Sequence, residues 1–423
     1  MHVVIIGNGI AGVTTAREVR KRRPDWAITL VSAESLQHWS RPALMYVYMG
    51  HMRLQDTWPY EERFWVTNRI ERVQGWVEGI EPDAHRVRLA DGRTLDYDQL
   101  VLATGSVPNR FGWPGQDLRR VSGMYSLQDL AAIEEGSVGL ERAVIVGGGL
   151  IGIELAEMFH SRGIDVTFLV REASYWCNAL PPEESAMVTE LIRAEHIDLR
   201  LSTELRSIED DGTGAVGAVV TSTGERLECG FVGLTAGVRP NLGALDGSGI
   251  QTGRGVLVDD CLRTSAADVW AVGDCAEIRR PEGQRNLLQQ VWYTGRLQGE
   301  AVARNLCGEP TPYEPGIWFN SAKFFDLEWQ TYGSVPPTPA DDEKHVVWQG
   351  DGRLVRLVLD RETGALRGVN SLGIRYRHRV FERWIAEGRS GAHVLDHLAE
   401  ATFDPELVRR YEDSIARTLR SQL

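Results

Sequence analysis

Residues 3–12 read Val-Val-Ile-Ile-Gly-Asn-Gly-Ile-Ala-Gly, and residues 143–152 read Ala-Val-Ile-Val-Gly-Gly-Gly-Leu-Ile-Gly. Each stretch is a short apolar run that ends in Gly-x-Gly-x-x-Gly and precedes a helix-compatible segment. Such a turn lets a pyrophosphate lie against the N-terminus of the helix, where free N–H groups and the positive end of the dipole meet it. A single copy would be weak evidence, because the glycines can simply permit close helix–strand packing. Two copies predict two bound dinucleotides and indicate electron transfer between them.

Length, charge and cysteine content narrow the class of protein. A chain of 423 residues with 43% hydrophobic and 25% charged residues is expected to form two or three globular domains. Its formal net charge of −13 argues against a general nucleic-acid or anionic-membrane role. The five cysteines contain no Cys-x-x-Cys pair, which argues against a disulfide framework, a zinc knuckle and a built-in redox disulfide.

The sequence contains no apolar run long enough to cross a bilayer. The N-terminal apolar run is short and lacks a basic flank, so it predicts a buried strand rather than a signal peptide. We therefore expect no membrane insertion and a cytoplasmic location.

The glycine patterns organise the chain into an α/β fold. We expect strand 3–6, a helix to about residue 22 and strand 27–31 in the first unit, and strand 143–146, a helix to about residue 161 and strand 166–170 in the second. The buried run that begins at Val269 is placed back in the first unit, which makes the second unit an insertion. The prediction is two Rossmann-like dinucleotide-binding domains (residues 1–113 with 241–314, and residues 114–240) and a C-terminal α+β domain (residues 315–423) whose end, from about 376, is helical.

Acidic and basic residues near the predicted strand ends are candidates for binding the dinucleotides. Glu34 follows the second strand of the first unit and is placed to bind ribose hydroxyls, or it is a solvated loop carboxylate. Asp274 leaves a buried strand and suits a polyol, or it caps a helix. Glu154 is expected in the first turn of the helix that follows the second glycine pattern, where it faces the dinucleotide or simply complements the helix dipole.

The second unit does not show which nicotinamide coenzyme it takes. Arg171 and Glu172 follow its second strand; the guanidinium suits the 2′-phosphate of NADPH, whereas the carboxylate suits the ribose of NADH. Both remain candidates.

Two further clusters have less specific interpretations. His393 and His397 are one helical turn apart, but no third ligand is near, so surface histidines are favoured over a metal site. The basic cluster of Arg375, Arg377, His378, Arg379 and Arg383 is either a solvated helix face or a docking patch for an acidic partner.

The motifs together resemble the pyridine nucleotide–disulfide oxidoreductase family over roughly residues 1–335. The resemblance includes Ala103-Thr-Gly-Ser106, Gly147 to Glu154, Gly237-Val-Arg-Pro-Asn241 and Ala271-Val-Gly-Asp274. Ser40-Arg-Pro-Ala-Leu44, the run Trp292 to Gly299 and Trp318 to Phe325 are similar to elements of the NADH–ferredoxin and rubredoxin reductases.

The resemblance assigns cofactors and residues to the two glycine turns. It implies FAD in the first unit, bound by Gly7, Asn8, Gly9, Ile10, Ala11, Gly12, Glu34, Arg41, the Val77 backbone, Ala103, Thr104, Gly105, Asp274 and Trp292. It implies NADH or NADPH in the inserted unit, bound by Gly147, Gly149, Leu150, Ile151, Gly152, Arg171, Glu172 and Gly237. Glu154, which would face the nicotinamide, is the candidate catalytic residue.

Two departures from the family pattern bear on the electron acceptor. Relatives that reduce disulfides carry a cysteine near position 41, where this chain has Arg41, which argues against disulfide and coenzyme A–disulfide reduction. The lysine that commonly lies near flavin N5 is also missing, and Met45-Tyr46 occupy that place.

The expected activity is hydride transfer from NAD(P)H to FAD followed by reduction of an external acceptor. A small acidic iron–sulfur protein, ferredoxin or rubredoxin, is the first choice, docked on the basic cluster. The alternatives are an NAD(P)H oxidase, a reductase of a small molecule such as a quinone, and a redox-sensing scaffold of the apoptosis-inducing-factor type. The oligomeric state is open, with a homodimer among the alternatives, and no metal is expected.

Overall fold

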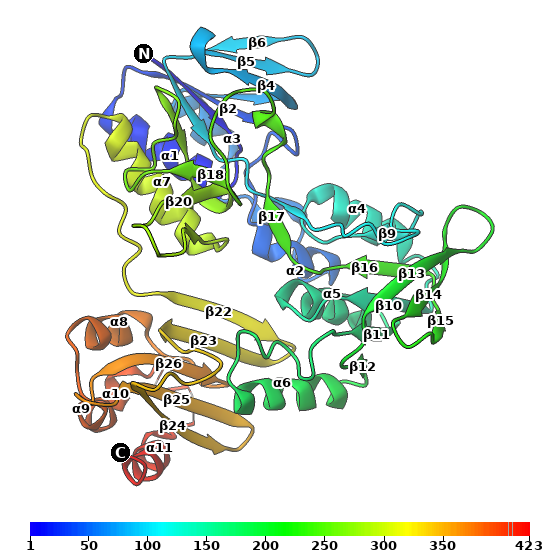
Figure 1. Cartoon of the computed structure of the whole chain (residues 1–423), viewed down its shortest axis with the longest axis vertical. Coiled ribbons are helices and arrows are strands. Elements are labelled where there is room, and N and C mark those ends of the chain that lie inside the picture. Colours follow the sequence, from blue (N-terminus) through cyan, green and yellow to red (C-terminus); the bar gives the residue numbers. More distant parts are fainter. Residues whose placement is uncertain (405, 408) are drawn as a thin grey trace. The chain divides into compact units, whose positions relative to one another are not determined.

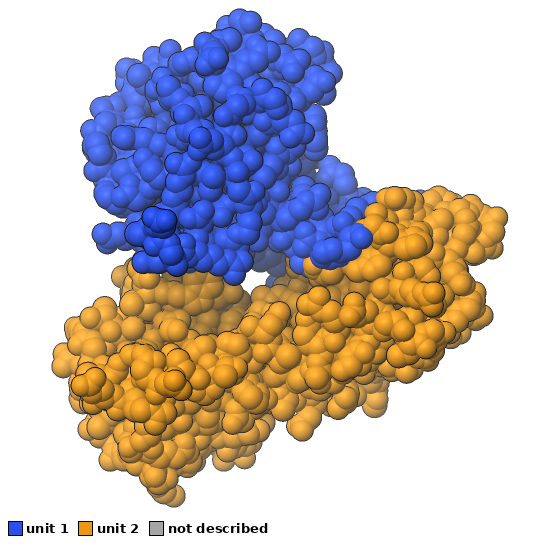
Figure 2. Space-filling view, viewed as in Figure 1, with its two compact units in different colours: residues 1–111, 122–138, 237–315 blue, residues 112–121, 139–236, 316–423 orange. Residues whose placement is uncertain are grey.

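The computed structural model describes residues 1–404, 406–407 and 409–423. These residues form two compact units (Figure 2). Unit 1 comprises Met1–Phe111, Ser122–Val138 and Gly237–Pro315, and unit 2 comprises Gly112–Val121, Gly139–Ala236 and Gly316–Leu423. The three-domain division remains a proposal, because its boundaries differ from those of the two units.

Unit 1 is built on a five-stranded, all-parallel sheet with the order β19-β7-β1-β2-β3 (Figure 1). Its strands are β1 (His2–Ile6), β2 (Ala27–Ser32), β3 (Ile70–Gln74), β7 (Gln99–Leu102) and β19 (Val269–Ala271). Val269 pairs with Leu100 and Ala271 with Leu102, so the strand expected to return to the first unit does so. The second dinucleotide pattern is therefore inserted in the first domain, as predicted.

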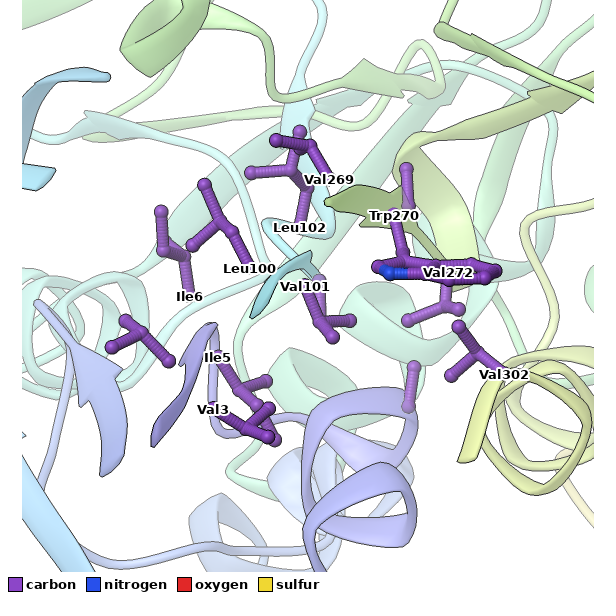
Figure 3. Close-up of a cluster of buried hydrophobic side chains, with 14 of the residues drawn as sticks. Val3, Ile5, Ile6, Leu100, Val101, Leu102, Val269, Trp270, Val272 and Val302 are labelled. Carbon is purple, nitrogen blue, oxygen red and sulfur yellow. The ribbon is translucent and has the colours of Figure 1, made fainter. Parts of the chain in front are cut away.

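The central strands of this sheet are buried on both faces, as parallel strands covered by helices usually are. Val3, Ile5, Leu100 and Val101 are all 0% exposed. Figure 3 shows these side chains in one cluster with Val269, Trp270 and Val302.

Two helices pack closely beside this core. They are α1 (Ile10–Arg22) and α7 (Trp292–Leu306). A Cβ on Gly299 would lie only 2.7 Å from the Ala11 carbonyl oxygen, so a larger residue there would force the helices apart.

The rest of unit 1 consists of short elements. An antiparallel sheet contains β4 (Val77–Glu81), β5 (Arg86–Leu89) and β6 (Thr94–Asp96); β8 (Ser106–Pro108) pairs with β17 (Val238–Pro240); and a further sheet contains β18 (Val256–Val258), β20 (Ala276–Ile278) and β21 (Leu287–Leu288). The short helices are α2 (Leu44–Tyr48), α3 (Glu62–Thr67) and α4 (Leu127–Gly136).

The second glycine pattern lies in another five-stranded sheet, with the order β12-β11-β10-β16-β9. Its strands are β9 (Val121–Ser122), β10 (Arg142–Val146), β11 (Asp165–Leu169), β12 (Asp198–Arg200) and β16 (Phe231–Leu234). β10 runs parallel to both β11 and β16. The accompanying elements are α5 (Leu150–Ser161), α6 (Pro182–Ala194) and the antiparallel sheet of β13 (Leu205–Asp210), β14 (Val216–Thr221) and β15 (Arg226–Glu228).

The C-terminal part of unit 2 is an antiparallel sheet covered on one face by helices, the expected α+β arrangement. The sheet has the order β22-β23-β26-β25-β24 and contains β22 (Phe319–Phe324), β23 (Leu327–Gly333), β24 (Glu343–Gly350), β25 (Arg353–Asp360) and β26 (Leu366–Leu372). Val355, Leu357 and Leu359 alternate along β25 and pack with Phe381 and Trp384.

The expected helical tail is a set of short helices. These are α8 (His378–Ala386), α9 (Gly391–Asp396), α10 (Leu398–Ala401) and α11 (Glu412–Arg420). Residues 405 and 408 of this tail lie outside the described residues. Among the helices that the structure describes, none combines the length and apolar character required to cross a membrane.

Leu102→Ala should lower the free energy of unfolding, because Leu102 is 0% exposed in the strand between β1 and β19. The expected loss is about 2–5 kcal/mol, since the substitution removes apolar contacts and leaves a cavity. Urea unfolding followed by tryptophan fluorescence measures the change. Leu297→Ala is the control, because Leu297 is 37% exposed, and its expected effect is within about 0.5 kcal/mol. Equal losses in the two variants would contradict the assigned core.

Candidate functional site

The two Gly-x-Gly-x-x-Gly turns have the same local geometry, and two glycines of each are required by the protein itself. Gly7 and Gly147 have φ values of +112° and +120°. A Cβ on Gly7 would lie 2.0 Å from the Ala103 carbonyl oxygen, and a Cβ on Gly12 would lie 2.0 Å from the Gly7 carbonyl oxygen. The first and third glycines therefore allow strand, turn and helix to approach each other closely.

The second turn repeats this arrangement. A Cβ on Gly147 would lie 2.6 Å from the Thr235 carbonyl oxygen, and one on Gly152 would lie 2.2 Å from the Gly147 carbonyl oxygen. Ile10 and Ala11 begin α1, and Leu150 and Ile151 begin α5 in the same way. In both turns, the helix therefore begins at the residue directly after the middle glycine.

The middle glycine of each turn is not required by any protein contact. A Cβ on Gly9 or Gly149 would meet no described protein atom within 4 Å. Both residues are N-caps without a side-chain hydrogen bond, and the first turns of α1 and α5 carry no acidic residue. The open space and the uncapped N–H groups fit a pyrophosphate, which is anionic and needs close approach to the backbone.

Asn8 fastens the first turn to a neighbouring segment. Its side-chain amide donates to the carbonyl oxygens of Ser35 at 2.6 Å and Gln37 at 3.3 Å. Its own carbonyl oxygen lies 2.7 Å from Nδ1 of His38. Burial lowers the pKa of His38 to about 4, so this imidazole is neutral at physiological pH.

Glu34 contacts Arg41 and the N-terminus of α4. One carboxylate oxygen accepts from Arg41 at 2.7 Å, and the other accepts from the Leu127 backbone N–H at 2.8 Å. The Arg41 guanidinium lies between the rings of Trp39, at 4.6 Å, and Tyr125, at 4.4 Å. Burial by itself would lower the pKa of Arg41, but the hydrogen bond that Arg41 donates to the Glu34 carboxylate outweighs burial, and the pKa of Arg41 is raised. The direct ribose contact of Glu34 remains a prediction.

Asp274 lies in a hydrogen-bonded group. Its carboxylate accepts from the Ser106 hydroxyl at 2.9 Å, and that hydroxyl in turn accepts from the Gln290 amide at 2.7 Å. The Tyr125 hydroxyl accepts from the Ser106 backbone N–H at 3.0 Å. Burial raises the pKa of Asp274 above its usual value. The sequence reasoning missed Gln290 and Tyr125, which no motif distinguishes.

The remaining residues expected to bind FAD lie in unit 1. The Thr104 hydroxyl donates to the Asn241 carbonyl oxygen at 2.7 Å, and Asn241 N–H donates to the Gly105 carbonyl oxygen at 2.9 Å. Val77 pairs with Leu89 in the antiparallel sheet and is buried. Trp292 begins α7 and is 36% exposed.

Glu154 lies on α5 just beyond its first turn, which contains no acidic residue, so the expected first-turn position is wrong by about one residue. Burial, with the charge of Glu157 as a second cause, raises the pKa of Glu154 to about 7. Glu157 itself forms an ion pair with Lys323 of β22 at 3.2 Å. A carboxyl with this pKa exchanges its proton near neutral pH.

Arg171 and Glu172 bind each other, and Gly237 lies with unit 1. The Arg171 guanidinium donates to the Glu172 carboxylate at 2.9 Å, and their side chains are 71% and 23% exposed. The choice between NADH and NADPH therefore stays open. Gly237 has a φ of +83°, and its carbonyl oxygen accepts from Asn109 N–H at 3.0 Å.

The basic cluster near α8 is partly neutralised. Arg375 binds the Glu328 carboxylate through contacts of 2.9–3.0 Å, and Arg383 pairs with Glu400 at 3.2 Å. The His378 ring lies 4.0 Å from the ring of Phe319, and burial lowers the pKa of His378. These contacts reduce the positive charge of the cluster at Arg375 and Arg383.

The rings of His393 and His397 stack 4.1 Å apart. Within the described part of the chain, no cluster of three His, Cys, Asp or Glu side chains could hold a metal ion. All five cysteines are free thiols.

Comparisons with known proteins agree with this geometry. Residues 1–296 match the model of the family described as pyridine nucleotide-disulphide oxidoreductase. The chain is 30% identical over 366 residues to the 5,5'-dehydrodivanillate O-demethylase ferredoxin reductase subunit of Sphingobium sp. (strain NBRC 103272 / SYK-6), covering 84% of this chain and 88% of the relative. It is 33% identical over 369 residues to the nitric oxide reductase FlRd-NAD(+) reductase of Escherichia coli O6:K15:H31 (strain 536 / UPEC), covering 85% and 93%.

A solved structure shares the fold. The ferredoxin reductase for the CYP199A2 system from Rhodopseudomonas palustris superposes with a TM-score of 0.80 at 24% identity, covering 88% of this chain and 91% of that one. At this identity the likeness establishes the arrangement of elements and leaves the chemistry to the residues.

Glu154→Gln should remove one pH-dependent part of the stability. The folded chain keeps the Glu154 proton up to a pKa of about 7, whereas the ordinary value is 4.5. The wild type should therefore lose stability relative to the variant as pH rises through this window, with no further loss above it. Melting temperatures of both proteins between about pH 4 and about pH 8 measure the difference. Glu190→Gln, at an exposed position of α6, is the control, and parallel curves for wild type and Glu154→Gln would contradict the prediction.

Proposed function

This chain belongs to the pyridine nucleotide-disulphide oxidoreductase family and is an FAD-dependent NAD(P)H oxidoreductase, and we propose that its acceptor is a small acidic iron–sulfur protein, either a ferredoxin or a rubredoxin. FAD, held at the first glycine turn, would supply the redox chemistry: it can accept a hydride and then deliver the two electrons singly to two acceptor molecules, with a proton released to solvent. The protein binds and orients the two dinucleotides.

The observation that carries the assignment of the two cofactor sites is the pair of open middle glycines. Gly9 and Gly149 face space that no described protein atom fills, at two uncapped helix N-termini. Gly7, Gly9 and Gly12 would hold the FAD pyrophosphate, and Gly147, Gly149 and Gly152 that of NAD(P)H. One chain thus has two separate dinucleotide cradles.

The nature of the acceptor rests on the cysteines and on the relatives. Arg41 occupies the place where disulfide-reducing relatives carry a cysteine, and all five thiols are free. Electrons therefore need an acceptor outside the chain. One relative is named as a ferredoxin reductase subunit and another as an FlRd-NAD(+) reductase, which supports an iron-containing carrier protein.

The chain's own polar residues would orient the flavin nucleotide. Arg41 is held by Glu34 and two aromatic rings, and Asp274 is held by Ser106. Both groups are therefore fixed before a ligand arrives, which reduces the ordering that binding requires. Glu154 would hold or release a proton beside the nicotinamide.

We also propose a cytoplasmic location. Five unpaired thiols suit a reducing compartment, and nicotinamide coenzymes are available there.

Two matched substitutions test the cradles separately. Gly9→Ala and Gly149→Ala each add one methyl group where the protein has room, and the φ values of −67° and −106° suit alanine. Gly9→Ala should weaken FAD binding by at least about tenfold, which corresponds to about 1.4 kcal/mol. Gly149→Ala should keep the yellow flavin and instead raise the KM for NAD(P)H by a similar factor.

Anaerobic stopped-flow with NADH and with NADPH measures flavin reduction, and FAD titration measures flavin affinity. Melting temperatures of the FAD-free variants close to that of the FAD-free wild type serve as the folding control, because bound FAD itself raises the melting temperature. If Gly149→Ala lost FAD while Gly9→Ala kept it, the assignment of the two turns would be wrong. If the wild type proved colourless and failed to bind FAD, the proposed function itself would be overturned.

Charge reversal on α8 tests whether the basic cluster docks the acceptor. Arg377→Glu combined with Arg379→Glu should slow NADH-dependent reduction of a ferredoxin or rubredoxin several-fold at low salt, because electrostatic steering is lost. Reduction of ferricyanide by the same variant should be unchanged. An unaffected carrier-protein rate at low salt would exclude this docking surface, and steady turnover with oxygen alone would favour an oxidase.

A further inference from the structure

Tyr175 touches the second dinucleotide turn from a distant part of the chain. Its side chain is 0% exposed, and its hydroxyl donates to the Gly149 carbonyl oxygen at 2.9 Å. The same oxygen accepts the first backbone hydrogen bond of α5, from Ile153 N–H, at the longer distance of 3.3 Å. Tyr175 therefore supplies the shorter of the two hydrogen bonds that hold the open middle glycine.

The Tyr175 backbone is in turn held by α6. Its N–H donates to the Thr189 hydroxyl at 3.1 Å, and its carbonyl oxygen accepts from the Ser185 hydroxyl at 2.6 Å. Ser185 also contacts the Ser174 hydroxyl at 2.6 Å. Thr189 and Ser185 lie one turn apart on the same face of α6, so a shift of this helix would move Tyr175 with it.

The helix α6 is tied to the C-terminal sheet by a buried ion pair. Glu184, 0% exposed, accepts from Arg356 of β25 at 2.7 and 2.8 Å. Asn370, the cross-strand neighbour of Arg356 on β26, donates to the same carboxylate at 3.3 Å. Figure 1 shows α6 beside this sheet. Arg356 alternates with residues that pack under α8, so it points to the opposite face.

Two aromatic rings also pack against the Tyr175 ring. The Tyr175 ring lies 6.0 Å from that of Phe168 on β11 and 6.1 Å from that of Phe324 on β22. The hydroxyl is thus confined by packing on two sides as well as by the hydrogen bonds of its backbone.

We propose that Tyr175 is a positioning residue for the nicotinamide coenzyme and that the C-terminal sheet, through Arg356, Glu184 and α6, sets its position. Tyr175 would act through the turn and not on the reacting atoms, because its buried hydroxyl binds the Gly149 carbonyl oxygen. The C-terminal sheet would thereby contribute indirectly to the NAD(P)H site, through its contact with α6. This inference rests on the proposed function.

Tyr175→Phe tests the hydroxyl. It keeps the ring and removes one hydrogen bond, so the KM and the stopped-flow Kd for NADH or NADPH should rise by about two- to tenfold. The kcat at saturating coenzyme and the Kd for FAD should stay within about twofold of wild type, since the bond serves coenzyme binding alone. The control is Tyr376→Phe, which removes another buried hydroxyl of unit 2, one without a hydrogen-bond partner among the described residues.

The outcomes separate positioning from general stability. A raised KM in Tyr175→Phe with an unchanged KM in Tyr376→Phe supports the proposal. An unchanged KM in Tyr175→Phe, or equal rises in both variants, overturns it. Both outcomes require that NADH or NADPH reduces the flavin of the wild-type protein. If it does not, the proposed function is refuted and not this inference.

A double-mutant cycle tests the connection to the sheet. Replacing Glu184→Met and Arg356→Met together avoids leaving one buried charge unpaired, which alone could unfold the protein. This pair of changes should also raise the KM for the coenzyme, and combining it with Tyr175→Phe should give less than the product of the two effects. Multiplicative effects, or an unchanged KM in the folded Glu184→Met/Arg356→Met protein, would overturn the role of the C-terminal sheet.

Discussion

The structure depends on how closely the backbone packs at the C-terminal end of β1 and of β10. In each unit the next parallel strand places a carbonyl oxygen where a Cβ of the first glycine would be, at Ala103 or Thr235. The helix then begins so near the turn that the third glycine has no room for a side chain either. This close packing fixes where the helix begins relative to the strand and leaves the open space at the middle glycine.

The charged groups around the first turn are held by one another. Glu34 binds Arg41, and the Ser106 hydroxyl binds Asp274, so each of these half-buried charged groups has a polar partner. An unpaired charge in this position would be destabilised by partial desolvation, and a mobile one would need to be ordered on binding. These hydrogen bonds restrain the side chains of Arg41 and Asp274.

Unit 2 uses buried charge in two different ways. Arg356 pairs with the buried Glu184 and also with Glu183 at 2.6 Å, and these bonds join α6 to the C-terminal sheet. Glu154, in contrast, has a like charge nearby in Glu157, and together with burial this raises the pKa of Glu154 to about 7. The ion pair of Glu184 and Arg356 is suited to holding two elements together. Glu154 can instead gain or lose a proton near neutral pH.

Local patterns in the sequence determined much of this fold. The apolar runs and glycine spacings predicted β1, α1, β2, β10, α5 and β11 within a residue or two, because a strand–turn–helix unit is specified by consecutive residues. The run from Val269 could also be placed, since a short apolar strand that ends in Gly-Asp belongs to a buried parallel sheet.

Tertiary structure alone decided which polar groups meet. Arg41 and Tyr125, Tyr175 and Gly149, and Glu184 and Arg356 are separated in sequence by 84, 26 and 172 residues. Nothing in the alternating run of β25 distinguishes Arg356 from an exposed arginine, and Tyr175 belongs to no motif. Periodicity reports only whether a residue lies on a buried face, whereas its partner depends on how distant elements pack against each other.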